Sequence, residues 1–106
     1  MEPVEAIVYA GANVTFTCSH PENVTFLWDF SSKVRSYDIT YAASMSNITL
    51  KPVYLSKITI YGATRYMSGE LSCSVENDGS KAVGFLIVNG NISFIETLRF
   101  KSRLYV

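Results

Sequence analysis

The spacing of two cysteines and one tryptophan constrains the fold of this 106-residue chain more than any other feature. Trp28 follows Cys18 by ten residues, and Cys73 follows Cys18 by fifty-five. Around Cys18, apolar side chains at Val14 and Phe16 alternate with polar ones, which is typical of a β-strand with one buried face. The three residues therefore belong to a strand-rich chain, one of whose strands directs Cys18 inward.

The segment before Cys73 carries a second pattern. Ile58 and Ile60 form an apolar-x-apolar pair, and the cysteine follows thirteen residues after the second isoleucine. Ala63 and Gly69 supply small residues between them. Together with the cysteine–tryptophan–cysteine spacing, this segment resembles the immunoglobulin superfamily, in which an E strand leads to the F-strand cysteine. The resemblance covers about residues 4–76 and implies an all-β, two-sheet sandwich.

Within that resemblance, Cys18 and Cys73 are expected to form the disulfide between the sheets, with Trp28 as the core tryptophan. A cross-link closing a loop of this length stabilises the fold by about 4 kcal/mol in the chain-entropy model. Two positions depart from the family. Met67 stands where an acidic residue is usual, and Leu71 stands where the corner tyrosine is usual. The chain is thus a divergent relative at its E–F corner.

We expect one domain over residues 1–106, of the variable type, because much chain lies between the predicted C and E strands. Strand A or A′ is expected at 4–9 and strand C at about 24–30. After strand C, we predict a C′ strand near 34–37 and a C″ strand and loop at 38–47. Strand D is predicted at about 48–54 and strand E at about 56–61.

The region after Cys73 is longer than a variable-type domain usually needs. Asn89-Gly90 between two apolar runs predicts a type I′ hairpin turn. Two arrangements follow from it. In the first, which we favour, the F and G strands extend into a long β-finger tipped by Asn89-Gly90, with a bulge or loop at 77–80. In the second, 81–88 is already strand G and 91–106 adds an extra edge strand.

Four N-glycosylation sequons indicate the secretory pathway, namely those at Asn13, Asn23, Asn47 and Asn91. Four of the six asparagines lie in sequons, where chance predicts about one. Two cysteines in a strand-rich chain also favour an oxidising compartment. We expect an extracellular or secretory-lumen ectodomain of a membrane-anchored or secreted glycoprotein. Its leader and anchor are expected outside residues 1–106, because no leader pattern or apolar span is present.

The inventory of reactive residues favours binding over catalysis. His20 is the only histidine, and it stands in a predicted loop beside Ser19 and Pro21. If the two cysteines form a disulfide, no tetrahedral metal set is available, and no glycine-rich phosphate loop is present. We therefore expect no cofactor, no metal site and no enzyme. The net charge of zero removes the electrostatic case for nucleic acid or an anionic membrane.

The predicted partner-binding residues fall in two groups. The first is apolar and lies in the F–G region: Val83, Phe85, Ile87, Ile92 and Phe94. Such a ribbon needs cover, either from a partner or from burial against the domain's own sheet. The second group, with Arg35 and Tyr37, lies on the expected C–C′ face, where the competing interpretation is a solvated surface.

The departures at the corner, the four sequons and the long F–G region resemble immunoglobulin-like glycoproteins of cytomegaloviruses and the adenovirus early region. This resemblance implies a viral immune-modulating protein that occupies a host immune receptor, antibody or antigen-presenting molecule. The alternative is a host leukocyte adhesion receptor, to which Gly11-Ala12-Asn13-Val14-Thr15 and Trp28-Asp29-Phe30 are similar. That alternative implies pairing with a related immunoglobulin-like domain, or with a second copy of this chain as a homodimer.

Overall fold

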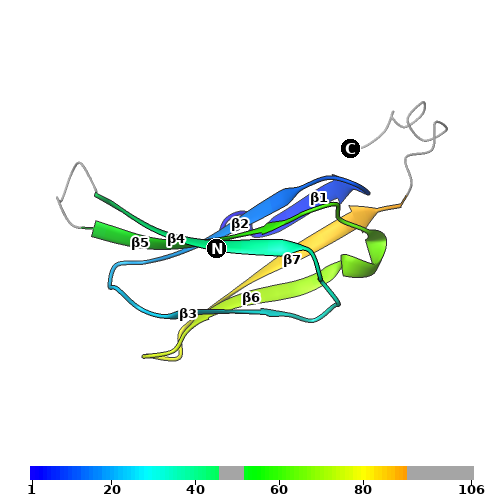
Figure 1. The fold of residues 1–106 in the computed structure, drawn as a ribbon. Coiled ribbons are helices and arrows are strands. Elements are labelled where there is room, and N and C mark those ends of the chain that lie inside the picture. The colour runs from blue at the N-terminus through cyan, green and yellow to red at the C-terminus, as the bar shows by residue number, and fades with distance from the viewer. Residues whose placement is uncertain (46–51, 91–106) are drawn as a thin grey trace.

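The computed structural model describes residues 1–45 and 52–90, which form two β-sheets packed face to face (Figure 1). One sheet has four strands in the order β1-β7-β6-β3, and the other has three in the order β2-β5-β4. The strands are β1 (Glu5–Tyr9), β2 (Val14–His20), β3 (Phe26–Phe30), β4 (Tyr37–Met45), β5 (Pro52–Ile60), β6 (Gly69–Val75) and β7 (Lys81–Asn89). A 3-10 turn, η1 (Arg65–Met67), precedes β6.

The two lateral sides of the sandwich differ. Glu2 pairs with Thr17 of β2, whereas residues 5–9 pair in parallel with β7 of the other sheet. The N-terminal segment therefore crosses between the sheets and closes one side. On the other side, β3 and β4 are the outermost strands of their sheets, and no further strand of the described residues pairs with either.

The core lies between the sheets and is built from alternating inward side chains of both. Its largest fully buried members are Phe16, Ile58 and Ile60 from the β2–β5 pair, and Leu71 and Leu86 from the β6–β7 pair. The expected disulfide is present, with 6.5 Å between the Cα atoms of Cys18 and Cys73. These observations confirm the two-sheet sandwich and its disulfide staple.

Serines form hydrogen bonds at the corner that contains Met67 and leads into β6. The Ser68 hydroxyl accepts the Val88 N–H at 2.9 Å, and the Ser32 hydroxyl donates to the Met67 carbonyl at 2.8 Å. Gly69 has φ +155°, and a Cβ there would lie 2.8 Å from the Ser31 hydroxyl, which itself accepts the Glu70 N–H. Short polar side chains and one glycine thus replace the usual salt bridge and phenol hydrogen bond.

The structure differs from expectation between β3 and β5. Residues 37–45 do not form C′ and C″ strands beside β3, because β4 pairs antiparallel with β5 along its whole length. The reason is the side-chain pattern. Tyr37 and Ile39 lie opposite the buried Ile60 and Ile58, and thus extend the apolar inner face of that sheet. Residues 46–51, which include the first part of the expected D strand, lie outside the described residues.

The favoured β-finger is wrong, and the second arrangement holds for residues 81–89. The chain turns at 76–80, where Gly79 has φ +73° and the Asp78 carboxylate accepts the Ser80 N–H. β7 then pairs back along β6. Inward burial of Leu86 and Val88 decides the outcome, because a protruding ribbon would leave both in water. The extra strand predicted for 91–106 lies outside the described residues.

Candidate protein-binding face

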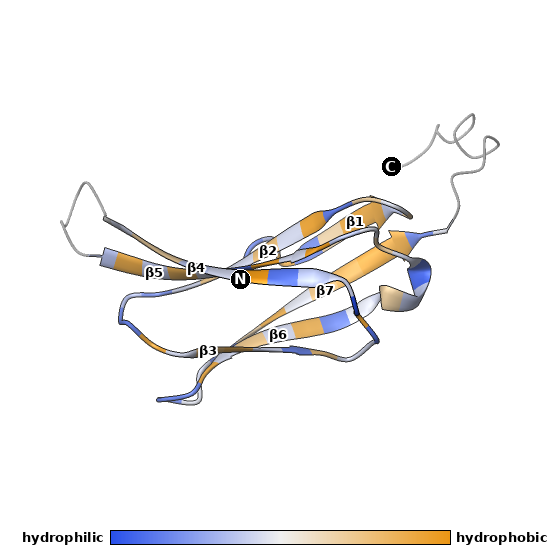
Figure 2. Ribbon diagram, in the orientation of Figure 1, coloured by the Kyte–Doolittle hydropathy of each residue, from blue (hydrophilic) through white to orange (hydrophobic). Residues whose placement is uncertain are grey.

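The outer face of the four-stranded sheet carries a row of exposed apolar side chains. Ile7 and Tyr9 project from β1, with 61% and 52% of their surfaces exposed, and Phe85 and Ile87 project from β7, with 44% and 38% exposed. Ile7 lies directly opposite Ile87 in the strand pairing. We call these four residues and the half-buried Val83 the apolar stripe. Figure 2 shows the hydrophobic colour running along both strands.

The stripe exists because β1 and β7 are apolar on both faces. Leu86 and Val88 alternate with the exposed residues of β7 and point into the core. In β1, Ala6 and Val8 pack against the same core. A half-buried antiparallel sheet normally places polar residues on its outer face. Exposed Ile, Phe and Tyr side chains in one contiguous patch are typical of an interaction surface.

Acidic side chains frame the stripe. Glu5 and Glu70 lie opposite Phe85 on its two neighbouring strands, so that one carboxylate stands on each side of the phenyl ring. Asp29 and Lys81 lie further across the same face. Within residues 1–45 and 52–90, none of these four groups forms an ion pair. The stripe therefore presents an apolar centre with a predominantly negative rim.

The structure separates the two predicted groups of binding residues. Val83, Phe85 and Ile87 lie together on the stripe. The expected C–C′ face, with Arg35 and Tyr37, is not formed. Arg35 lies in the connection from β3 to β4 and Tyr37 begins β4, which belongs to the other sheet. Ile92 and Phe94 lie outside the described residues.

Sequence reasoning missed Ile7 and Tyr9 as members of the candidate face. The signal available was the lack of apolar–polar alternation within residues 4–9, where apolar residues fall at both even and odd positions. That pattern identifies a strand without a polar face. The parallel pairing of β1 with β7, which places both residues beside Ile87, is a contact between segments about eighty residues apart.

Two sequons can be placed in the fold. Asn13 is exposed before β2, and its side-chain oxygen accepts the Gly62 N–H at 3.0 Å, which leaves the amide nitrogen available for a glycan. Asn23 is exposed in the loop between β2 and β3. Neither lies on a strand of the four-stranded sheet. The sequons at Asn47 and Asn91 lie outside the described residues.

A histidine, an aspartate and a serine meet at the end of the sandwich where β6 turns into β7. His20 Nε2 lies 3.4 Å from Asp78 Oδ2, and the Ser80 hydroxyl donates to Asp78 Oδ1 at 2.7 Å. Hydrogen bonds from Ser80 hold the pKa of the Asp78 carboxyl below its usual value, with a smaller contribution from His20. His20 Nδ1 accepts the Glu22 N–H. Because Nδ1 already accepts this hydrogen bond, the ring offers no acceptor to the Ser80 hydroxyl, which donates to the Asp78 carboxylate. This cluster shapes the turn and does not have the geometry of a nucleophilic triad.

Comparison with known proteins supports the fold and goes no further. No protein-family model and no curated protein matches the chain. Among solved structures, the M1 domain from titin, an immunoglobulin-like domain, is similar with a TM-score of 0.57 and 19% sequence identity. The match covers 84% of this chain and 92% of that domain. The chain has an immunoglobulin-like fold. No helix among the described residues is long and apolar enough to cross a membrane.

Proposed function

We propose that this chain is an extracellular protein-binding domain that engages another cell-surface protein through the apolar stripe. The observation that carries the proposal is the exposure of Ile7, Tyr9, Phe85 and Ile87 as one patch on a single sheet face. Aromatic side chains at the centre of a patch with a polar rim are typical of protein-binding interfaces. The proposed activity is binding, without catalysis.

Two further observations support the extracellular setting. The Cys18–Cys73 disulfide is compatible with an oxidising compartment. The two sequons in the described residues, at Asn13 and Asn23, lie at opposite ends of β2 and off the face that carries the stripe. Glycans at these positions would cover the ends of the sandwich and leave the stripe accessible to a partner.

Within this class, the finer proposal is a viral immune-modulating glycoprotein that occupies a host immune receptor or antigen-presenting molecule. It rests on the departures at Met67 and Leu71 and on the density of sequons. The long F–G finger no longer supports it, because 81–89 is an ordinary sheet strand. The alternative is a host leukocyte adhesion domain that pairs with a related domain. In that case too, we place the contact on the stripe, since no C′ strand of the described residues pairs with β3.

The test is staining of primary leukocytes with fluorescent multimers of the glycosylated domain. The variant Ile7→Asp/Phe85→Asp places two charges in the stripe. Thr40→Asp/Ala42→Asp is the matched control, because both residues are exposed on β4 in the other sheet. We expect the wild type and the control to stain a leukocyte subset, and the stripe variant to lose at least about tenfold in affinity.

The possible results separate the parts of the proposal. Equal staining by the stripe variant would exclude the apolar stripe as the contact. Absence of staining by the wild type would contradict a leukocyte-surface partner. Circular dichroism and thermal unfolding of each multimer subunit verify that all variants remain folded, which is expected because every substituted side chain is outside the core.

A further inference from the structure

The open side of the sandwich leaves inner-face aromatic residues uncovered. Tyr37 and Tyr41 of β4 share the inward face with Ile58 and Ser56, yet 42% and 64% of their surfaces are exposed. The other side of the sandwich is closed by the N-terminal segment, where Glu2 pairs with β2 before β1 joins β7. An inner face of this kind is normally covered by a further strand or loop.

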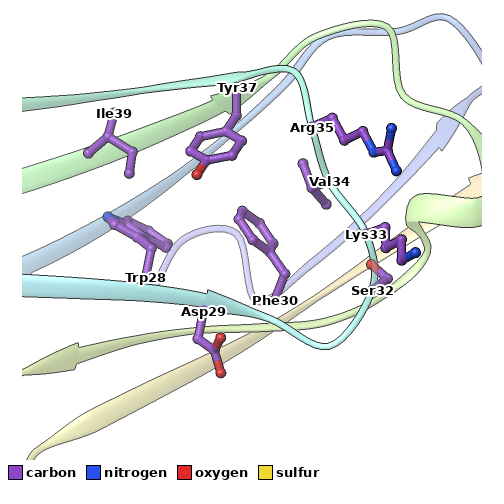
Figure 3. Close-up of a pocket in the computed structure, with 9 residues that line it drawn as sticks. All are labelled: Trp28, Asp29, Phe30, Ser32, Lys33, Val34, Arg35, Tyr37 and Ile39. Carbon is purple, nitrogen blue, oxygen red and sulfur yellow. The ribbon is translucent and has the colours of Figure 1, made fainter.

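A cavity of about 360 Å³ opens at this side between β3 and β4. Figure 3 shows Trp28 and Phe30 rising from β3 toward Tyr37 and Ile39 of β4, with Val34 beside them. The Phe30 and Tyr37 rings lie 5.6 Å apart between centroids. One wall of the cavity is therefore aromatic and aliphatic, and polar side chains, among them Ser32, Lys33 and Arg35, line the rest. Its volume is suited to one or two large side chains.

The backbone along the edge of this cavity is available for pairing. Thr25 and Ser31 flank β3. Thr25 accepts the N–H of Glu76, directly after β6, and the Ser31 N–H donates to Glu70 of β6. Because bonded positions alternate along an antiparallel strand, the N–H and C=O groups of Trp28 and Phe30 point away from β6, toward the open edge. A strand edge with outward-pointing backbone groups beside a side-chain pocket is the arrangement used in recognition by strand addition.

Charge indicates the chemistry of the occupant. Lys33 and Arg35 line the cavity and form no ion pair within the described residues. Asp29 also lines the cavity, and the two cations outnumber it, so that the charge along this opening is net cationic (Figure 3). A second copy of the chain would bring the same two cations to the contact. The chain's own residues 91–106 carry Arg99, Lys101 and Arg103 against one acid, Glu96, and are equally unsuited.

We propose that the open side is a second binding site, for an extended acidic segment of another protein that adds as a strand to the free edge of β3. In this arrangement the backbone of the segment pairs with Trp28 and Phe30. One apolar side chain enters the cavity against Tyr37 and Ile39, and a carboxylate meets Lys33 and Arg35. This site is distinct from the apolar stripe and does not depend on it.

The experiment uses a phage-displayed library of random linear peptides panned against the folded, disulfide-bonded domain. Selected peptides are synthesised and titrated against the fluorescence of Trp28, which is the only tryptophan and lines the cavity. We expect enrichment of peptides that combine an aromatic or aliphatic residue with nearby acidic residues. Binding should slow hydrogen exchange at the Trp28 and Phe30 amides.

Charge reversal provides the matched pair of variants. Lys33→Glu/Arg35→Glu should weaken binding of the selected peptides by about tenfold or more. Lys57→Glu/Arg65→Glu, which makes the same change in net charge at exposed positions outside the cavity, should leave binding unchanged. The substituted residues are exposed, so that loss of folding does not confound the result.

Four outcomes of the library experiment would overturn the proposal. They are an absence of enriched peptides, enrichment of basic peptides, equal binding to the wild type and to Lys33→Glu/Arg35→Glu, or loss of binding to Phe85→Asp rather than to the cavity variant. A synthetic peptide of residues 91–106 is titrated in parallel. Binding of that peptide with the same dependence on Lys33 and Arg35 would assign the site to the chain's own C-terminal segment and reject an external partner.

Discussion

At the scale of single residues, Trp28 links the two sheets by a hydrogen bond and by packing. Its indole N–H donates to the Ser56 hydroxyl of the opposite sheet at 2.8 Å, and its ring packs against both parts of the core, including the disulfide. Ser56 is fully buried and lies opposite Cys18 in the β2–β5 pairing. A buried hydroxyl at this position is therefore the polar partner that permits a tryptophan in the core.

We predict that Ser56→Ala lowers the free energy of unfolding by about 1–2 kcal/mol, because the indole N–H loses its acceptor in a part-buried site. Urea unfolding followed by tryptophan fluorescence measures the change. Ser19→Ala removes a hydroxyl from an exposed position of the adjoining β2 and should cost much less. Equal losses for the two variants would show that the cross-sheet hydrogen bond contributes little.

At the level of elements, hydrogen bonds of serines hold the corner between β5 and β6. Its geometry depends on Ser68, which links η1 and the start of β6 to the end of β7 through the Val88 N–H. Val88 is itself almost fully buried, at 5% exposed. The corner thus fastens the same strand whose outer face carries Phe85 and Ile87, and the conformation of the apolar stripe depends on it.

We expect Ser68→Ala to speed hydrogen exchange at the Val88 amide and to lower the free energy of unfolding by about 1 kcal/mol. Ser68→Thr keeps a hydroxyl and should retain most of the protection. Exchange followed by nuclear magnetic resonance resolves the single amide. If Val88 exchanges at the wild-type rate in Ser68→Ala, the β1–β7 pairing alone would account for the position of this strand.

For the whole molecule, the disulfide is the main constraint on a small core with one open side. Cys18 of β2 and Cys73 of β6 connect the two sheets across a sequence separation of 55. Loop closure on this scale restricts the unfolded chain and contributes about 4 kcal/mol in the chain-entropy model. That is a large share of the stability of a single domain of this size.

We predict that Cys18→Ala/Cys73→Ala lowers the free energy of unfolding by about 4 kcal/mol, and that reduction of the wild type has a comparable effect. Guanidinium unfolding with and without dithiothreitol gives both values. The double variant should itself be insensitive to the reductant, which makes it the internal control. A loss no larger than that of Ser56→Ala would mean that packing, rather than the cross-link, holds the sheets together.

The sequence alone determined the sandwich, its disulfide and the position of Trp28, because these depend on local alternation and on a spacing that few folds share. It also identified Val83, Phe85 and Ile87 as a candidate surface. It misjudged the segments that could pair in more than one way. Asp78-Gly79 and Asn89-Gly90 are comparable turn signals, and an apolar run such as 81–88 fits either a finger or a sheet strand.

Only the tertiary structure resolved these alternatives, through burial that no local pattern contains. Pairing of β7 with β6 and β1 buries Leu86 and Val88 and brings Ile7 beside Ile87, which creates the apolar stripe. Pairing of β4 with β5 leaves β3 as an edge strand within residues 1–45 and 52–90 and opens the cavity beside Trp28. Both candidate sites arise from contacts between distant segments, because the choice of strand neighbours depends on the total apolar surface buried rather than on any one segment.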